Sequence, residues 1–483
     1  YTISRERALE VIAEKKEADA KKLIAHFEEA GIKVQHGPYG PYITDGKKNA
    51  RAPKDQEPTE LTLEQCQEIL AKAPEKKKRG KKNTKTSGTK AATSKKTAAK
   101  KTASKKASSR KKTTRRTVSE KRDKETTAKI EKMVDGIVKS SLAQNDPFLD
   151  IPVRSVSNMK FNQRKRILEM GENTQRRTLF NVGQARKFMQ GVLLSKGCRE
   201  LIAADKTLSL RGMYYMSLHT IEGTNEKTFN DQSESDGILE DLEVTLDGLR
   251  EELHVFAKKR GTMVGNITVT DNGDEIDCRR MGTGGYAIPS ICEPSVIQFG
   301  KCEADFVLHV EKDTVWSRFN EDRFWEEHNC ILTEGSGQPP RGVRRLLSRL
   351  NKELGLPIYC LLDCDPWGHY IYSVIKQGSI NLAFESQRMA VPDAKFIGIR
   401  ADDYDRCDLS PDVRIALNDR DIARAKQIAD YPWFLDRKPW QKEIRTMLAN
   451  GFKMEVESLI TKDISYVTET YVPERLKARD FLD

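Results

Sequence analysis

Acidic residues follow two apolar segments whose composition is typical of buried strands. Residues 305–310 end directly before Glu311, and residues 357–362 end directly before Asp363, with Asp365 two positions further on. Ligands of open α/β sheets bind beyond the carboxyl ends of the strands. Asp363 and Asp365 project to the same side if the strand continues through both. These three carboxylates could hold Mg²⁺, a hard cation that prefers oxygen ligands, or they could simply cap nearby helices.

A pair of tyrosines lies in LRGMYY, a segment with helical spacing. Arg211 precedes Tyr215 by four residues, which places its guanidinium on the same helix face as the phenol. A phenol with a pKa of about 10 is a weak nucleophile unless a cation or a base favours the phenolate. Arg211 could do this or could hold a target phosphate. Two adjacent tyrosines in a helix are also typical of one core residue beside one rim residue.

Arginines gather at the start of a predicted helix over residues 342–354, in the segment GQPPRGVRRLLSR. Arg341, Arg344 and Arg345 have the spacing i, i+3 and i+4, so they share one helix face. This face could be solvated, or it could contact DNA phosphates beside a bound metal. The spacing leaves both interpretations open.

One segment is extremely basic. Residues 76–116 contain 19 Lys and Arg and no Asp or Glu, and without these charges the net charge of +12 becomes −7. This composition cannot bury enough apolar surface to offset chain entropy, so we expect residues 76–118 to be disordered. We expect this linker to bind DNA, although a solubilising linker is the alternative. Its first basic side chains are Lys76, Lys77, Lys78 and Arg79.

The rest of the chain divides into three segments. In residues 1–75 we expect a helix over 8–27, strands at 32–34 and 42–44, and a helix over 61–70 with Thr62 as its N-cap. In residues 119–290 helical spacing occurs at 183–194, 208–218 and 238–253, and Asn272-Gly273 predicts a hairpin. In residues 300–483 strands and helices alternate, with a further strand at 395–399, which favours a parallel α/β sheet.

Several function classes are disfavoured. The nine cysteines form no CxxC pair and are odd in number, which argues against a disulfide framework or a zinc finger and favours a reducing, cytoplasmic compartment. No apolar run reaches about 18 residues, so we expect no membrane span. The segment GTGGYAIP is a turn by its pattern, and no P-loop is present, so we expect no nucleotide site in this chain.

Seven motifs in fixed order over residues 120–483 resemble those of one family. They are LRGMYY, QSESDGILEDLE, GTGGYAIP, ADFVLHVE, GQPPRGVRRLLSRLNKELGLP, DCDPWG and VTETYVPERL. In kind and order they are similar to the A subunit of DNA topoisomerase VI, a type IIB enzyme, and to the transesterase that starts meiotic recombination. The resemblance implies a multidomain α+β and α/β protein. A winged-helix, CAP-like domain would cover residues 119–295 and a Toprim domain residues 296–483.

The resemblance also implies roles for particular residues. Tyr215 would be the nucleophile that attacks a DNA phosphate, with Arg211 one turn before it, and Glu311, Asp363 and Asp365 would bind Mg²⁺. The family's A subunit forms a homodimer in which each tyrosine acts with the partner's metal site. It joins an ATP-binding B subunit in an A₂B₂ complex on double-stranded DNA, which implies a nucleoid-associated protein with no membrane contact. Gly212 departs from the family, whose members usually have an acidic residue there.

Residues 1–75 show a second resemblance. YTISRERALEVI, GPYGPYI and LTLEQCQEIL, followed by the Lys-Ala-Thr tail, are similar to the C-terminal repeat and tail of a bacterial type IA DNA topoisomerase. The chain opens on Tyr1 and not on Met, so we expect Tyr1 to lie downstream of a larger topoisomerase I region. A natural fusion, a truncated product and a joined sequence are the alternatives.

Three hypotheses about function follow. The first is the DNA-cleaving and rejoining A subunit of an ATP-dependent type IIB topoisomerase, which forms a 5′-phosphotyrosyl intermediate and relaxes or decatenates DNA. The second is a recombination enzyme that uses the same residues to break both strands without resealing. The third is a DNA-binding protein whose site is inactive.

Overall fold

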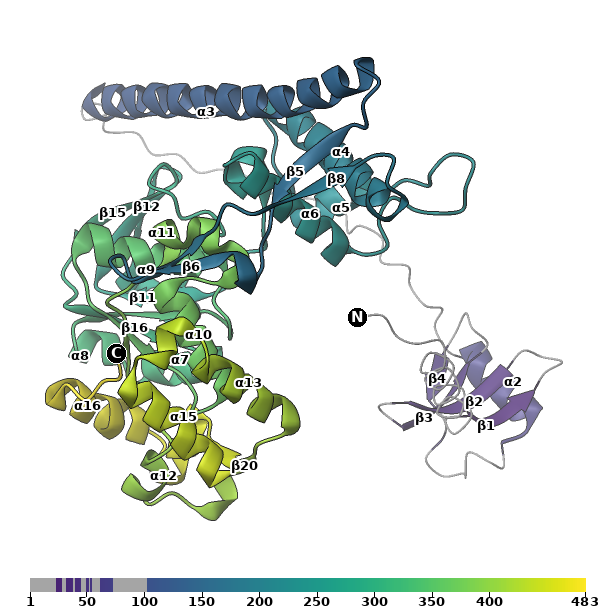
Figure 1. The fold of residues 1–483 in the computed structure, drawn as a ribbon. Coiled ribbons are helices and arrows are strands. Elements are labelled where there is room, and N and C mark those ends of the chain that lie inside the picture. Colours follow the sequence, from purple (N-terminus) through teal and green to yellow (C-terminus); the bar gives the residue numbers. More distant parts are fainter. Residues whose placement is uncertain are drawn as a thin grey trace, which may run out of the picture. The chain divides into compact units, whose positions relative to one another are not determined.

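The computed structural model describes residues 23–27, 32–37, 40–44, 49–51, 53, 61–72 and 102–483. The chain forms two compact units, Tyr1–Ala98 and Ala99–Asp483 (Figure 1). Each unit has a hydrophobic core of its own.

The first unit contains a four-stranded antiparallel sheet and one helix. The strands are β1 (Leu23–Phe27), β2 (Ile32–Gly37), β3 (Gly40–Thr44) and β4 (Asn49–Arg51), in that order across the sheet, and the helix is α2 (Leu63–Lys72). The predicted strands at 32–34 and 42–44 and the predicted helix at 61–70 are confirmed. The Thr62 hydroxyl accepts a hydrogen bond from the Gln65 N–H at 3.4 Å, and the Gln65 side chain accepts one from the Thr62 N–H at 3.0 Å.

The predicted helix over residues 8–27 is wrong at its end. Residues 23–27 form β1, which pairs with β2, and residues 8–22 lie outside the described part of the chain. A short apolar run such as LIAHF fits either a helix or a strand by its own pattern. The pairing with β2 decides in favour of the strand.

The second unit begins with a helical part. Its helices are α3 (Thr102–Leu142), α4 (Val182–Ala203), α5 (Leu210–Ser217) and α6 (Gln232–Thr245), followed by the 3₁₀ helix η3 (Arg250–Leu253). Two strand pairs accompany them: β5 (Phe148–Pro152) with β8 (Thr174–Thr178), and β9 (Leu208–Ser209) with β10 (Val255–Phe256). Ile130, Leu194, Met213, Leu239 and Leu242 are among the buried residues that hold α3 to α6 together.

Two sequence predictions for this part need correction. Residues 102–118, which we expected to be disordered, are the first turns of α3 in the structure. Ala and Lys are strong helix formers, and no Gly or Pro interrupts the chain from Thr102 to Asp135, so composition alone does not exclude a helix. The helical pattern over 238–253 is broken where α6 ends at Thr245, because Asp247 has a positive φ of 44° before η3 begins.

The second part of the unit is built on a six-stranded sheet. Its order is β14 (Tyr286–Ala287), β11 (Thr262–Gly265), β17 (Cys330–Glu334), β16 (Phe306–Val310), β18 (Ile358–Leu361) and β19 (Lys395–Phe396). The last four strands are parallel, as predicted, whereas β11 and β14 are antiparallel additions. The sheet thus includes strands from residues N-terminal to 296, where we expected the second domain to begin.

Helices and a second sheet surround this core (Figure 1). The helices are α7 (Asp313–Glu321), α8 (Phe324–Glu327), α9 (Arg341–Leu354), α10 (Pro366–Gln377), α11 (Ser386–Met389), α12 (Asp403–Arg406), α13 (Asp419–Ala429), α14 (Pro432–Leu435), α15 (Lys438–Asn450) and α16 (Val472–Ala478). A three-stranded sheet is formed by β13 (Asp274–Asp277), β12 (Ile267–Asp271) and β15 (Ile297–Cys302). Two further strand pairs are β6 (Met159–Asn162) with β7 (Ile167–Met170), and β20 (Ile415–Ala416) with β21 (Phe452–Lys453).

The predicted hairpin at Asn272-Gly273 is confirmed. It joins β12 to β13, and both turn residues have positive φ, 48° and 95°. Two-residue hairpin turns of this kind favour Asn and Gly because these residues tolerate positive φ at low cost.

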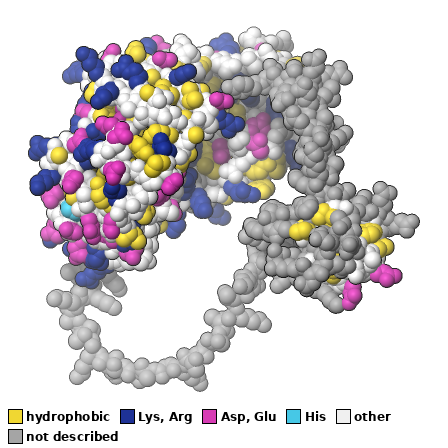
Figure 2. Space-filling model, turned by 90° about the horizontal axis from the view of Figure 1, so that it is seen from below, with side chains coloured by type: hydrophobic (Ala, Val, Ile, Leu, Met, Phe, Trp, Pro, Cys, Tyr) yellow, Lys and Arg dark blue, Asp and Glu magenta, His cyan; other side chains and the backbone are white. Residues whose placement is uncertain are grey.

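The described surface mixes charges of both signs. On the face in Figure 2, Lys and Arg alternate with Asp and Glu, and hydrophobic side chains are scattered among them. Within the described residues, no helix has the length and apolar character that crossing a membrane requires.

Candidate active site

Glu311 and Asp363 follow adjacent parallel strands at the point where the sheet's connections reverse. From β16 the chain passes through α7 and α8 to β17 on one side, and then through α9 to β18 on the other side. Val310 and Leu361 are paired across β16 and β18, so the residues after them meet at the carboxyl edge. This reversal is where open α/β sheets bind their ligands.

The structure brings the Glu311 and Asp363 side chains into one small network. The Glu311 carboxylate accepts a hydrogen bond from the Asp363 N–H at 3.2 Å. One oxygen of Asp363 accepts a hydrogen bond from the Val456 N–H at 2.8 Å, and the other contacts Lys312 Nζ at 2.8 Å. Asp363 is buried, and Glu311 is half-buried.

Lys312 was missed by sequence reasoning. Its ammonium also contacts Glu457 at 3.0 Å and Glu455 at 3.2 Å, so one cation bridges acidic residues from two distant segments. Burial alone would lower the pKa of Lys312, but Asp363 and Glu457 raise it above its ordinary value. The available signal in the sequence was the position of Lys312 directly after Glu311, the acid at the end of a strand.

Asp365 lies two residues beyond Asp363 but points to a different partner. Its carboxylate is the N-cap of α10 and accepts a hydrogen bond from the Gly368 N–H at 2.5 Å. Capping was the second explanation that the sequence allowed for these acids. In this arrangement the helix N-terminus stabilises its negative charge.

Burial raises the pKa of all three carboxyl groups. For Glu311 the nearby Asp363 carboxylate adds to the rise, whereas for Asp363 the hydrogen bond from Lys312 opposes it. For Asp365 the hydrogen bond from the Gly368 N–H opposes it. Acids held close together and away from water are a recurring property of metal and catalytic sites.

These donors fit a hard divalent cation in chemistry. They offer only carboxylate oxygens, and a cation would neutralise charges that burial disfavours. Among the described residues, however, no group of three or more His, Cys, Asp or Glu side chains lies close enough together to hold a metal. The reason is visible in the contacts: Asp365 caps a helix, and Lys312 already neutralises Asp363.

Tyr215 projects from α5 with 57% of its side chain exposed. The Arg211 guanidinium lies over its ring, with its carbon 5.7 Å from the ring centroid, so the predicted one-turn pairing is present. The Tyr214 ring is 5.1 Å from the Tyr215 ring but packs against the buried helical core. One tyrosine therefore supports the core, and the side chain of the other is exposed.

Packing against Leu208 explains why glycine occupies position 212. A side chain there would place its Cβ 2.6 Å from Cγ of Leu208, which packs against the helical core. The Gly212 N–H also donates to the hydroxyl of Ser209, the N-cap of α5, at 3.1 Å. The departure from the usual acidic residue thus accompanies a leucine that occupies the space.

The predicted site residues form two separate groups within the second unit. Arg211 and Tyr215 belong to the helical part, and Glu311, Asp363 and Asp365 belong to the edge of the six-stranded sheet (Figure 1). A reaction that needs both groups would therefore have to bring them together.

The predicted arginine face is largely covered by other segments of the chain. Arg341 contacts Glu240, Glu243 and Glu385. The Arg345 guanidinium forms a bidentate ion pair with the Glu293 carboxylate, with hydrogen bonds of 2.9 and 3.0 Å. Arg344 is 3% exposed. The shared face was predicted correctly, but it packs inward, because acids far away in sequence cover it.

The first basic residues of the linker cannot be placed. Lys76, Lys77, Lys78 and Arg79 lie outside the described residues, and their contact with DNA stays a prediction.

Comparison with protein families gives four matches along the chain. Residues 306–476 match the Toprim domain family of Spo11 and the topoisomerase 6 A subunit, and residues 186–255 match Type IIB DNA topoisomerase. Residues 259–303 match the all-beta domain in the DNA topoisomerase VI alpha subunit. Residues 26–82 match the Topoisomerase C-terminal repeat, which agrees with the second resemblance seen in the sequence.

Curated relatives extend over most of the chain. The A subunit of type 2 DNA topoisomerase 6 from Pyrococcus horikoshii is 40% identical over 358 residues, which are 72% of this chain and 93% of the relative. The protein of the same name from Aeropyrum pernix is 36% identical over 371 residues, covering 74% and 94%. The A3 subunit of DNA topoisomerase 6 from Oryza sativa is 32% identical over 367 residues, covering 76% and 80%. The chain belongs to the family formed by the A subunits of type 2 DNA topoisomerase 6.

Proposed function

We propose that this chain is the DNA-cleaving and rejoining A subunit of an ATP-dependent type IIB DNA topoisomerase. The observation that carries the proposal is the exposed Tyr215 with Arg211 over its ring, one residue from a tyrosine that packs into the core. The family membership supports the same assignment. In this proposal α4 to α6 belong to a winged-helix domain.

The Tyr215 hydroxyl attacks a phosphorus atom of the DNA backbone. The phenol gives up its proton to solvent as a bond forms between its oxygen and phosphorus, the bond from phosphorus to the 3′ oxygen breaks, and the freed 3′ oxygen takes a proton from solvent. The product is a 5′-phosphotyrosyl link, which keeps the bond energy of the phosphodiester. Resealing is the reverse attack by the 3′ hydroxyl, so this chain needs no ATP for it.

Arg211 has two tasks in this step. Its guanidinium lies over the Tyr215 ring, so a positive charge stands beside the attacking residue. The guanidinium also binds phosphate oxygens well, and its exposure leaves it free to do so. Both effects stabilise negative charge as the new bond forms.

Glu311, Asp363 and Asp365 are the proposed Mg²⁺ ligands. When bound, the ion supplies positive charge that neutralises phosphate oxygens in the transition state. Binding of the ion requires the Asp365 carboxylate to release the Gly368 N–H and Lys312 to release the Asp363 carboxylate. Lys312 also contacts Glu455 and Glu457, so it keeps acidic partners when it leaves Asp363.

The separation of Tyr215 from the three carboxylates within one chain is the basis for a proposal about subunit assembly. We propose a homodimer in which Tyr215 of one copy meets the carboxylates of the other, joined by two ATP-binding B subunits to form an A₂B₂ complex on double-stranded DNA. Two such sites cut both strands of a duplex. The second function, a one-way breaker for recombination, uses the same residues, but the topoisomerase C-terminal repeat in the first unit favours topology control.

The test uses supercoiled plasmid, Mg²⁺, ATP and a co-expressed B-type partner. After a detergent quench, wild type should yield linear DNA with protein attached to its 5′ ends, and Tyr215→Phe should reduce this product at least about 1,000-fold. Relaxation in the unquenched sample then separates a topoisomerase from a one-way breaker.

Tyr214→Phe is the matched control, because it removes an identical hydroxyl one residue away. It should cleave at nearly the wild-type rate. Equal cleavage by wild type and Tyr215→Phe would exclude the proposed nucleophile, and no covalent product with a verified partner would favour an inactive, DNA-binding protein.

A further inference from the structure

A cavity of about 430 Å³ lies in the second unit beside the start of α9. Most of the remaining wall comes from residues 255–260 after η3, residues 289–293 before β15, and residues 379–388 around α11. Glu240, Arg250, Glu251 and Tyr370 complete it. It is distinct from the carboxylates of Glu311, Asp363 and Asp365, none of which lines it. The proposed DNA chemistry makes no use of this cavity.

Positive charge dominates the cavity wall. Seven basic side chains and three acidic ones line it, and two further acids, Glu243 and Glu385, pair with its arginines from behind. Arg341, Arg345 and Arg388 are neutralised by these acids. The wall therefore carries an excess of two positive charges, with Lys258 and Arg260 on its exposed side.

Arg344 is the unusual member of this set. Its side chain is 3% exposed, and its Nε and Nη2 atoms have no hydrogen-bond partner. Burial lowers the pKa of Arg344 to about 10, still far enough above neutrality to keep the charge. An unpaired buried charge is strongly destabilising, so a side chain of this kind calls for a ligand that supplies the missing acceptors.

The start of α9 adds further donors at the same place. Its N-cap is Pro340, whose side chain makes no capping hydrogen bond, so the first N–H groups of a 14-residue helix have no acceptor within the helix. The cavity is lined by Pro340, Arg341 and Gly342. Gly342 lets the wall approach closely, because a Cβ there would lie 2.2 Å from the Pro289 carbonyl oxygen. A helix N-terminus favours anions.

We propose that this cavity binds a phosphate group, with the Arg344 guanidinium and the N-terminus of α9 as its main donors. A tetrahedral oxyanion offers several acceptors at once and carries the negative charge that the wall lacks. The group could come from free inorganic phosphate or from a DNA backbone. The proposal rests on the cavity alone and stands or falls independently of the cleavage chemistry of Tyr215.

The first test is thermal unfolding of the full chain in sodium phosphate and in sodium chloride of equal ionic strength. Phosphate should raise the melting temperature of wild type beyond the chloride control. Arg344→Met should lose this response and should melt higher than wild type in chloride, because it removes an unpaired buried charge. Arg344→Lys should keep part of the response.

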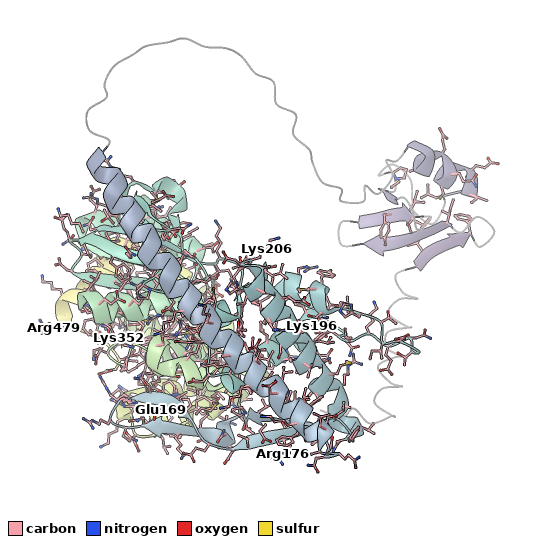
Figure 3. All side chains as sticks on the ribbon, turned by 90° about the horizontal axis from the view of Figure 1, so that it is seen from above. Glu169, Arg176, Lys196, Lys206, Lys352 and Arg479 are labelled. Carbon is pink, nitrogen blue, oxygen red and sulfur yellow. The ribbon has the colours of Figure 1, made fainter. Side chains whose placement is uncertain are left out.

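The control variant is Lys196→Gln, on the exposed surface of α4 (Figure 3). It removes one positive charge outside the cavity and should respond to phosphate as wild type does. A wild-type melting temperature that is the same in phosphate and chloride would overturn the proposal, and so would a full response in Arg344→Met.

The two possible sources of the phosphate group are distinguished by measuring the binding of a short DNA duplex by anisotropy. If the duplex supplies the group, Arg344→Met weakens duplex binding and inorganic phosphate competes with the duplex in wild type only. If a free anion is the ligand, Arg344→Met binds the duplex as wild type does and loses only the phosphate-dependent stabilisation.

Discussion

Tyr214 and Tyr215 show how neighbouring residues of the same type acquire different environments in a helix. Successive positions on α5 are about 100° apart, so Met213 and Tyr214 reach the helical core while Tyr215 turns outward. Arg211, one turn earlier, falls on the same outward face. Helix geometry thus makes Tyr214 a packing residue and leaves Tyr215 exposed.

Gly212 and Leu208 should be energetically coupled. Gly212→Ala places a Cβ against Leu208 Cγ, and we expect it to lower the free energy of unfolding by about 1–2 kcal/mol. In a Leu208→Ala background the same substitution should be neutral or stabilising by up to about 1 kcal/mol, because Ala is the better helix former. Urea unfolding of the four variants measures this coupling. Equal costs in both backgrounds would show that Leu208 is not the obstacle.

Asp480 should make stability depend on pH. Burial alone raises its pKa, but hydrogen bonds from Arg406 and Arg400, each at 2.8 Å, outweigh this and hold the pKa at about 2. A lowered carboxyl pKa contributes stability above its unfolded value of 3.8 and loses it as pH falls toward 2. Asp480→Asn should therefore be less stable than wild type at pH 7 by about 1–2 kcal/mol.

The difference between Asp480→Asn and wild type should shrink at pH 3.5. Urea unfolding at pH 7, 5 and 3.5 provides the comparison, and the pH 5 value should match that at pH 7. A difference that is as large at pH 3.5 as at pH 7 would mean that the carboxylate charge is not what stabilises this contact.

At the scale of elements, strand ends position the acidic site. The sequence was sufficient to find β16 and β18, because both are short apolar runs with acids directly after them. It also predicted the hairpin at Asn272-Gly273, whose turn depends on local backbone preferences. Features that depend on residues close together in the sequence are those that a single sequence predicts best.

Contacts between distant segments explain what the sequence did not reveal. Lys312 reaches Glu455 and Glu457, and Arg341 reaches Glu240 and Glu243, across roughly a hundred residues or more in each case. No pattern among residues close together in the sequence predicts such ion pairs. For the same reason the arginines of α9 were correctly placed on one helix face, but the two interpretations of that face, solvent or DNA phosphates, did not include the acids that cover it.

The cap of α2 gives a prediction at this scale. Thr62→Ala removes the hydroxyl that accepts from the Gln65 N–H, which should cost about 1 kcal/mol of local stability. Amide exchange at the start of α2, followed by mass spectrometry of the full chain, should become about five-fold faster. Thr62→Ser keeps the hydroxyl and should exchange as wild type does. Unchanged exchange in Thr62→Ala would mean that the cap does not limit opening of this helix.

At the scale of the whole molecule, charge is distributed very unevenly. Residues 76–116 hold 19 of the 84 Lys and Arg, while the described residues on the face shown in Figure 2 carry charges of both signs. DNA affinity that depends on such a segment arises mainly from released counterions and therefore falls with salt. The active site and the main source of non-specific affinity would then be separate parts of the chain.

Replacing residues 76–101 by a neutral Gly-Ser linker of equal length tests this separation. The replacement removes 12 Lys and Arg and leaves α3, which begins at Thr102, intact. The slope of log affinity against log salt should become less steep, by about 0.9 for each phosphate contact that is lost. Covalent cleavage at low salt should persist. An unchanged slope would mean that this segment does not bind DNA.

The most direct measurement of the central claim is the site of covalent attachment. Trapped protein–DNA complexes would be digested with nuclease and trypsin, and the nucleotide-linked peptide from Gly212 to Lys227 would be fragmented in a mass spectrometer. Fragment ions separate an adduct on Tyr214 from one on Tyr215. We predict a 5′-nucleotide on Tyr215 alone. An adduct on Tyr214, or on any residue outside this peptide, would contradict the proposed mechanism.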